Sequence, residues 1–261
     1  MFLISLVSKK FSSMKILVCI SNVPDTTSKI NFTDGDTKFD TNGVQFVINP
    51  NDEFGLTRAM WFKEKQGATV HIATVGDASV EPTMRKALAI GADEAIRINA
   101  LPTDGYYVAH QLAEVVKNGG YDLVIAGRES IDYNGGMVPG MLATLLDMNF
   151  ANTCIGLEID GTTATATREI DGGKETLEAS LPLVIGGQKG LVEESDLRIP
   201  NMRGIMMARK KALNVVEPID APSQTNDQKF EKPAEKGPVK LVDANNVGEL
   251  VSLLHNEAKV I

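Results

Sequence analysis

The sequence predicts an α/β protein with a doubly wound, mostly parallel sheet, a β-hairpin extension and an extended C-terminal arm. Residues 15–20 form a continuous apolar run, which is typical of a strand covered on both faces. From residue 52 to residue 146, apolar strands alternate with helices, and this alternation indicates a parallel sheet. Residues 162–170 and 175–181 alternate on either side of Asp171-Gly172-Gly173, which favours a hairpin.

The elements of the sheet domain are predicted in a regular order. The run that begins at Asn49 predicts the start of a helix, because it contains a proline, acidic residues and polar side chains that can cap the free N–H groups. Before this helix, the short segments 29–32 and 44–48 are predicted to form an insertion between the first strand and the first helix. The strands are predicted at 15–20, 69–75, 94–98, 122–126 and 183–185, and the helices at 52–66, 80–90, 104–117 and 137–146.

Three stretches divide the chain. We predict that residues 1–13 are a disordered or mis-assigned N-terminal extension, because Met14-Lys15 is a natural start for the first strand. Residues 14–216 form the α/β domain. Residues 217–261 are a polar, Pro-rich arm with few large apolar residues, ending in an amphipathic helix at 245–256 that has nothing local to pack on.

Composition excludes several classes of function. A net charge of −8 and a pI near 5.0 argue against nucleic-acid binding. Cys19 and Cys154 are too few for a disulfide framework, and the three histidines lack metal-ligand spacing, so no metal site is predicted. The apolar run within residues 1–13 is too short to span a bilayer. We therefore expect a cytoplasmic protein without membrane insertion.

Candidate ligand-binding residues follow the strands. In doubly wound sheets, ligands lie beyond the carboxyl ends of the strands, near the point where the strand order reverses. Residues 127–138 after the fourth strand are rich in glycine and precede a helix, which favours an anion or phosphate cradle. No GxGxxG and no GxxxxGK[ST] is present, so neither a Rossmann fingerprint nor a P-loop is predicted.

The hairpin carries a family resemblance. Arg168-Glu169-Ile170-Asp171-Gly172-Gly173, Glu175-Thr176-Leu177 and Pro182 resemble, in order and spacing, the signature of the electron transfer flavoprotein β subunit. Gly186 departs from that signature, in which Thr, Ala or Cys is usual. The resemblance extends from Met14 to the C-terminus and implies an adenine-nucleotide α-hydrolase-like fold.

The resemblance implies a binding site for AMP. The loop 132–138 reads Asp-Tyr-Asn-Gly-Gly-Met-Val where bacterial members often read Asp-Gly-Asp-Thr-Gly-Gln-Val, so the glycine backbone contacts are the ones expected to persist. The residues matched to the nucleotide site are Cys19, Asn49, Pro50, Asn51, Asp52, Val75, Gly76, Asp132, Asn134, Gly135, Gly136, Met137 and Val138.

The resemblance also implies protein partners. Residues 205–211 resemble the family's Ile-Met-x-Ala-Lys-Lys-Lys, and this register places the apolar anchor of the partner-recognition loop at Met202, with Leu191 and Leu197 as further contacts. The arm 217–261 would embrace an α subunit. The charged hairpin tip, with Arg168, Glu169 and Asp171, would lie at the subunit interface beside the flavin.

The function implied is that of an electron carrier, not of an enzyme, because no catalytic residues are identified. The heterodimer would hold structural AMP in this subunit and FAD mainly in the α subunit. It would pass electrons from acyl-CoA dehydrogenase-type enzymes of fatty acid oxidation to a quinone reductase. Three alternatives stay open: a bifurcating-type β subunit with a second FAD, a stand-alone ATP-binding protein of the same fold, and a subunit that serves assembly alone.

Overall fold

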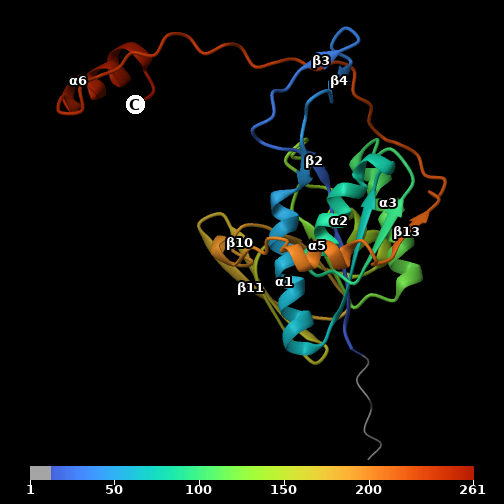
Figure 1. Cartoon of the computed structure of the whole chain (residues 1–261). Helices are drawn as coiled ribbons and strands as arrows, with labels where there is room; N and C mark the ends of the chain where they lie inside the picture. The colour runs from blue at the N-terminus through green and yellow to red at the C-terminus, as the bar shows by residue number, and fades with distance from the viewer. Residues whose placement is uncertain (1–12) are drawn as a thin grey trace, which may run out of the picture.

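The centre of the protein is a nine-stranded sheet (Figure 1), seen in a computed structural model that describes residues 13–261. The predicted extension 1–13 lies outside the described residues, except for Ser13. Strand order is β11-β10-β9-β12-β8-β1-β6-β7-β13. The strands are β1 Lys15–Cys19, β6 Thr69–Val75, β7 Glu94–Ile98, β8 Leu123–Gly127, β9 Asn149–Asp160, β10 Thr163–Ile170, β11 Gly173–Ser180, β12 Leu183–Gly187 and β13 Leu213–Val216.

Most of the sheet is parallel. In the order of the sheet, all neighbouring strands from β9 to the edge strand β13 run parallel, whereas β10 pairs antiparallel with both β9 and β11. The predicted hairpin is therefore the pair β10–β11, which extends one edge of the sheet. The α/β, doubly wound prediction is confirmed.

Helices cover both faces of the sheet. Ile16 and Val18 of β1 pack in one core with α1 Pro50–Gln66 and α2 Glu81–Ile90. Leu17 and Cys19 pack in a second core with α3 Gly105–Gly119 and α4 Val138–Leu146. Successive side chains of a strand point to opposite faces, so a strand buried on both sides is apolar throughout.

Two strands of the sheet lie outside the sequence prediction. β9 is 12 residues long, but one or two more exposed positions separate each buried residue from the next, so it lacks a continuous apolar run. β13 is four residues long, lies at the sheet edge and pairs with β7, more than 110 residues earlier in the chain. The smaller elements are β2 Asn22–Pro24, β3 Phe32–Thr33, β4 Lys38–Phe39, β5 Phe46–Ile48, η1 Ala78–Val80, η2 Glu194–Asp196, α5 Met202–Ala208, α6 Val247–Ser252 and η3 Leu253–Ala258.

The strand order reverses at β1. The chain proceeds from β1 to β6 and β7 on one side, and then crosses to β8 on the other side of β1. The connections that follow β1 and β8 therefore leave in opposite directions. In doubly wound sheets this place, at the carboxyl ends of the strands, is where the ligand crevice lies, and the region between the two connections is called the crevice here. This is the position at which the sequence predicts a ligand.

The C-terminal arm first follows the domain and then leaves it (Figure 1). Gln111, buried on α3, exchanges two hydrogen bonds of 2.8 and 2.9 Å with the backbone of Ile219. Phe230 stacks on Phe32 with ring centroids 5.0 Å apart. Beyond these contacts, the arm carries α6 away from the sheet with Val247, Leu250 and Val251 exposed. No helix within residues 13–261 has the length and apolar character needed to cross a membrane.

Candidate functional site

Asp52 joins the two strand ends at the reversal point. Its side chain, 2% exposed, lies in the first turn of α1. One carboxylate oxygen accepts a hydrogen bond of 2.7 Å from the Ser21 backbone N–H, which follows β1. The other accepts one of 2.8 Å from the Gly127 N–H at the end of β8. A single carboxylate therefore sets the separation of the two loops that border the crevice.

Burial dominates the titration of this carboxyl group. Desolvation raises the pKa of Asp52 to about 7, although the hydrogen bonds from Ser21, Asn49 and Gly127 act in the opposite direction. Burial, followed by the charge of Asp52, also raises the pKa of the nearby Cys19 thiol. Cys19 is therefore a neutral, buried thiol and not a nucleophile.

Asn49 and Asn51 hold the loop that follows β8. The side-chain amide of each donates a 3.0 Å hydrogen bond to the carbonyl of Glu129. The Asn49 side-chain oxygen also accepts from the Ile131 N–H at 3.2 Å. Asn49 is fully buried and its side chain makes no capping bond to α1, contrary to the capping expectation. The hydrogen bonds of the Asn49 side chain therefore go to the loop after β8 and not to the start of the helix, where the sequence predicts them.

Gly127 is required by close packing. A Cβ atom at this position would lie 2.4 Å from a carboxylate oxygen of Asp52 and 2.8 Å from the Cβ of Asn51. Real Cβ contacts are not this short, so only glycine lets β8 end against the start of α1. The crevice is thus built by residues matched to the family's nucleotide site, by Gly127 from the predicted cradle, and by Ser21, which follows the first strand.

The glycine-rich loop continues from this frame into solvent. Asp132, Asn134, Gly135, Gly136 and Met137 are exposed, and Val138 is half-buried at the first position of α4. Asn134 and Gly136 have φ of 50° and 62°, and such a backbone turns sharply. No side chain caps α4, and Pro139 at its second position has no N–H, so the donors at its start are the backbone N–H groups of Val138 and Gly140. N–H groups at a helix start suit an anion.

Val75 and Gly76 end the neighbouring strand, β6. Both are buried, and Val75 lies two residues after Ala73, the register partner of Cys19. The Gly76 carbonyl accepts a hydrogen bond of 3.0 Å from buried Arg97. Pro50, at the first position of α1, is half-buried. The structure therefore brings the strand-end residues together along one edge of the sheet.

A polar chain connects the crevice to the hairpin. Arg128, directly after β8, donates to the Gln188 side-chain oxygen at 3.2 Å. Gln188 in turn donates to a carboxylate oxygen of Glu169 on β10 at 2.6 Å. Arg168 lies 3.3 Å from Glu175 across the hairpin. The sequence does not predict this contact between the loop 127–138 and the hairpin, because Gln188, which links them, is distant from both Arg128 and Glu169 in the sequence.

A second candidate surface is the α5 segment, defined here as residues 198–208. Ile199 and Met202 are 86% and 75% exposed, and Met206 and Met207 are also exposed. Leu197 is half-buried against the core, and Leu191 is only 3% exposed. Leu191 is packed within its own chain, and its contact with a partner stays a prediction.

The α5 segment is held at both ends. Arg198 makes a two-pronged ion pair with Glu64 of α1, with both N–O distances 2.6 Å. The Asn201 side chain caps α5 by accepting from the Gly204 N–H at 2.8 Å. A Cβ atom at Gly204 would lie 2.3 Å from the carbonyl oxygen of Ala89, so α5 rests directly on α2. The exposed side chains therefore stand on a fixed backbone.

Residues 13–261 contain no group of three or more His, Cys, Asp or Glu side chains that could hold a metal ion. The chemistry available is instead that of backbone donors at the crevice and apolar contact at the α5 segment.

Comparison with known proteins identifies the family. The sequence model of the family described as "Electron transfer flavoprotein domain" matches residues 36–221. The chain belongs to the electron transfer flavoprotein β-subunit family. Electron transfer flavoprotein subunit beta of Bacillus subtilis is 36% identical over 262 residues, covering 95% of this chain and 100% of that protein.

Other relatives support the same assignment. Electron transfer flavoprotein subunit beta of Syntrophomonas wolfei is 34% identical and covers 95% of this chain and 98% of its own length. The Homo sapiens protein of the same name is 33% identical and covers 80% of this chain and 83% of its own length. Membership of the electron transfer flavoprotein family confirms the resemblance seen in the hairpin and assigns the chain a role in electron transfer.

Proposed function

We propose that this chain is the β subunit of a heterodimer that binds AMP in this subunit and FAD mainly in an α subunit. The heterodimer accepts electrons from acyl-CoA dehydrogenase-type enzymes and passes them to a quinone reductase. The observation that carries the proposal is the methionine-rich α5 segment, exposed on a backbone anchored to α1 and α2. This combination suits a carrier that must meet more than one partner.

Met202 is the proposed anchor of this surface. Large exposed apolar side chains on a monomer mark interaction sites when they gather in one place. Met202, Met206 and Met207 gather on a helix of seven residues. The methionine side chain is flexible and polarisable, so it adapts to differently shaped partner pockets. A fixed backbone with adaptable side chains favours contact with partners of different shapes.

The proposed AMP site lies at the carboxyl edge of the sheet. Asn49, Asn51 and Asp52 act there by holding the loops, since their polar groups already bond Ser21, Gly127, Glu129 and Ile131. The phosphate would bind to backbone N–H groups of Gly135 and Gly136 and to the start of α4. Cys19, Val75 and Gly76 would form the wall of the site beneath the nucleotide.

The remaining elements serve the heterodimer in this proposal. The exposed apolar side of α6 has no partner within the described part of the chain, and an α subunit would cover it. The hairpin tip, fixed through Glu169, Gln188 and Arg128, would stand at the subunit interface beside the flavin. Removal of residues 217–261 tests the arm, since an intact heterodimer after truncation would refute its embracing role.

Nucleotide content tests the proposal as a whole. The chain is co-expressed with its α subunit, the heterodimer is purified, and the released nucleotides are quantified. We expect one FAD and one AMP per heterodimer, with flavin reduction by an acyl-CoA dehydrogenase and its substrate. Two FAD per heterodimer would instead indicate the bifurcating type. Steady ATP hydrolysis by the isolated chain, abolished by changes in the loop 132–138, would indicate an ATP-using protein.

A further inference from the structure

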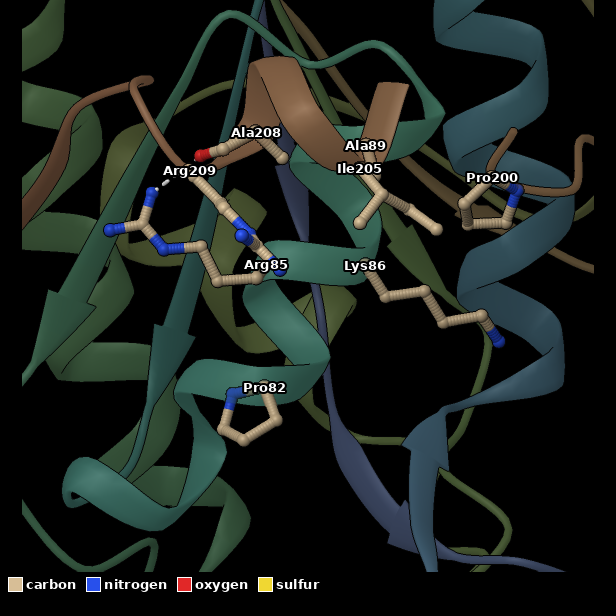
Figure 2. A pocket seen from close by; sticks show the side chains of 8 residues that line it. All are labelled: Pro82, Arg85, Lys86, Ala89, Pro200, Ile205, Ala208 and Arg209. Carbon is tan, nitrogen blue, oxygen red and sulfur yellow. Dashed lines mark hydrogen bonds between the residues drawn. The ribbon is translucent and has the colours of Figure 1, made fainter. Parts of the chain in front are cut away.

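A pocket of about 370 Å³ lies between α2 and the α5 segment (Figure 2). One wall is a single face of α2, with residues at positions i, i+3, i+4 and i+7, which line up along a helix. The other wall comes from the α5 segment and the residue after it. The lining residues are Pro82, Arg85, Lys86, Ala89, Pro200, Ile205, Ala208 and Arg209.

The pocket is cationic although the chain as a whole carries a net charge of −8. Arg85, Lys86 and Arg209 contribute to the lining, and no carboxylate does. Arg85 is engaged, since its guanidinium donates to the Ala208 carbonyl at 2.8 Å. Lys86 lies 3.1 Å from Glu53 on α1. Arg209 is exposed and forms no ion pair or side-chain hydrogen bond with the described residues.

The rest of the lining is apolar and adjoins the exposed methionines. Pro82 and Ala89 come from α2, whereas Pro200 and Ile205 belong to the α5 segment itself. Figure 2 shows Arg85 and Arg209 toward one end of the pocket, and Ile205, Pro200 and Lys86 toward the other. Because the Lys86 ammonium is paired with Glu53, the unpaired cation lies at the Arg209 end. A side chain with an apolar stem and a charged end matches this division.

We propose that the pocket receives a carboxylate side chain, of the glutamate type, from the surface of the dehydrogenase that donates electrons. This inference rests on the proposed function, because it assigns a second contact to the surface on which Met202 is the apolar anchor. Arg209 supplies the free cation, and Pro200 and Ile205 contact the stem. The pocket gives the apolar contact an orientation and selects partners that carry an acidic residue beside their docking site.

Charge complementarity across an interface acts mainly on specificity and association. An apolar patch alone permits rotation of the partner about Met202, whereas a second, ionic contact fixes one orientation. Because the pocket walls are helices α2 and α5, packed at Gly204 and Ala89, little rearrangement is needed on binding.

The test measures electron acceptance by the complete heterodimer from an acyl-CoA dehydrogenase. Arg209→Gln removes the free cation from the pocket. Lys210→Gln removes the same charge one residue away, on a side chain that does not line the pocket. We expect Arg209→Gln to raise KM for the heterodimer roughly fivefold to tenfold with kcat unchanged, and Lys210→Gln to raise it less than about twofold. Arg209→Glu should raise KM further than Arg209→Gln.

The outcomes separate this inference from the proposed function. Equal KM changes in Arg209→Gln and Lys210→Gln would overturn the pocket contact and leave only long-range attraction, while the proposed function would stand. Failure of the wild-type heterodimer to accept electrons from the dehydrogenase would overturn the proposed function itself. Bound flavin, measured by its absorbance in each variant, confirms that the heterodimer has formed.

Discussion

Arg85 of α2 caps the C-terminal end of α5, and Lys211, which follows α5, caps the C-terminal end of α2. The Arg85 guanidinium on α2 donates at 2.8 Å to the backbone carbonyls of Ala208 and Lys211, where α5 ends. The Lys211 ammonium returns to α2 and donates to the carbonyls of Leu88 and Ala92 at 2.9 and 2.5 Å. The last carbonyls of a helix lack hydrogen-bond donors within the helix, and here the Arg85 and Lys211 side chains donate to carbonyls at the two helix ends. This exchange locks α5 onto α2.

Lys211→Met should loosen this lock. The variant keeps the apolar stem but removes the donors to two carbonyls, so we expect a loss of about 1–3 kcal/mol in the free energy of unfolding. Urea denaturation of the full chain measures it. Lys210→Met is the matched control, since Lys210 is exposed and makes no such bonds, and its change should stay within about 0.5 kcal/mol. Equal losses in both variants would contradict the capping role of Lys211.

Met202→Ala should weaken docking without disturbing the flavin. Met202 is highly exposed, so its truncation leaves no cavity in this chain and stability should change by less than about 0.5 kcal/mol. We expect KM for electron acceptance from a dehydrogenase to rise roughly tenfold, because truncated interface anchors cost on the order of 1–2 kcal/mol. Leu101→Ala, on another exposed apolar residue, is the control. Unchanged kinetics in Met202→Ala would remove this residue from the proposed docking surface.

Asp52 should make stability depend on pH. Its pKa is raised in the folded state to about 7, so between pH 4 and pH 7 the folded chain binds a proton that the unfolded chain has released. Stability therefore falls as pH rises through this window, by up to about 1.4 kcal/mol per pH unit, and this fall ends above the folded-state pKa. Urea denaturation at several pH values gives the free energy of unfolding of the wild type and of Asp52→Asn. The difference between the two at each pH isolates the contribution of this carboxyl group.

The Asp52→Asn chain should lack this slope. It should also be less stable by about 1–3 kcal/mol at low pH, because its amide donors face the N–H groups of Ser21 or Gly127. Parallel pH profiles for wild type and Asp52→Asn would show that the carboxyl group does not titrate in this window.

Gly127→Ala should disrupt the crevice. The added Cβ would lie 2.4 Å from the Asp52 carboxylate, and a forced shift of this kind typically costs about 1–3 kcal/mol. We expect a lower melting temperature and loss of the proposed AMP from the purified heterodimer. Gly248→Ala is the control, because nothing lies within 4 Å of its added Cβ and alanine favours the helix α6. Retention of AMP and stability in Gly127→Ala would refute the close-packing requirement.

The parts of the fold that depend on local pattern were predictable. The helices at 52–66 and 80–90 agree with α1 and α2 to within about two residues, because apolar periodicity and the glycines at 67 and 91 mark their length. The predicted hairpin agrees with β10 and β11, because alternating residues mark its strands and the glycines at 172 and 173 mark its turn. The edge strand β13 was not predictable, since among the described residues it pairs with β7 alone and its own residues are largely exposed.

The sequence by itself determined the family, the parallel sheet and the edge at which a ligand is expected, because each is encoded in short runs of neighbouring residues. Only the tertiary structure decided how those residues are used. It turned Asn49 and Asp52 inward to hold loops about 80 residues away, buried Leu191, and left Met202 exposed. The physical reason is that a polar group's partner, or an apolar group's cover, comes from whichever distant segment the fold places beside it.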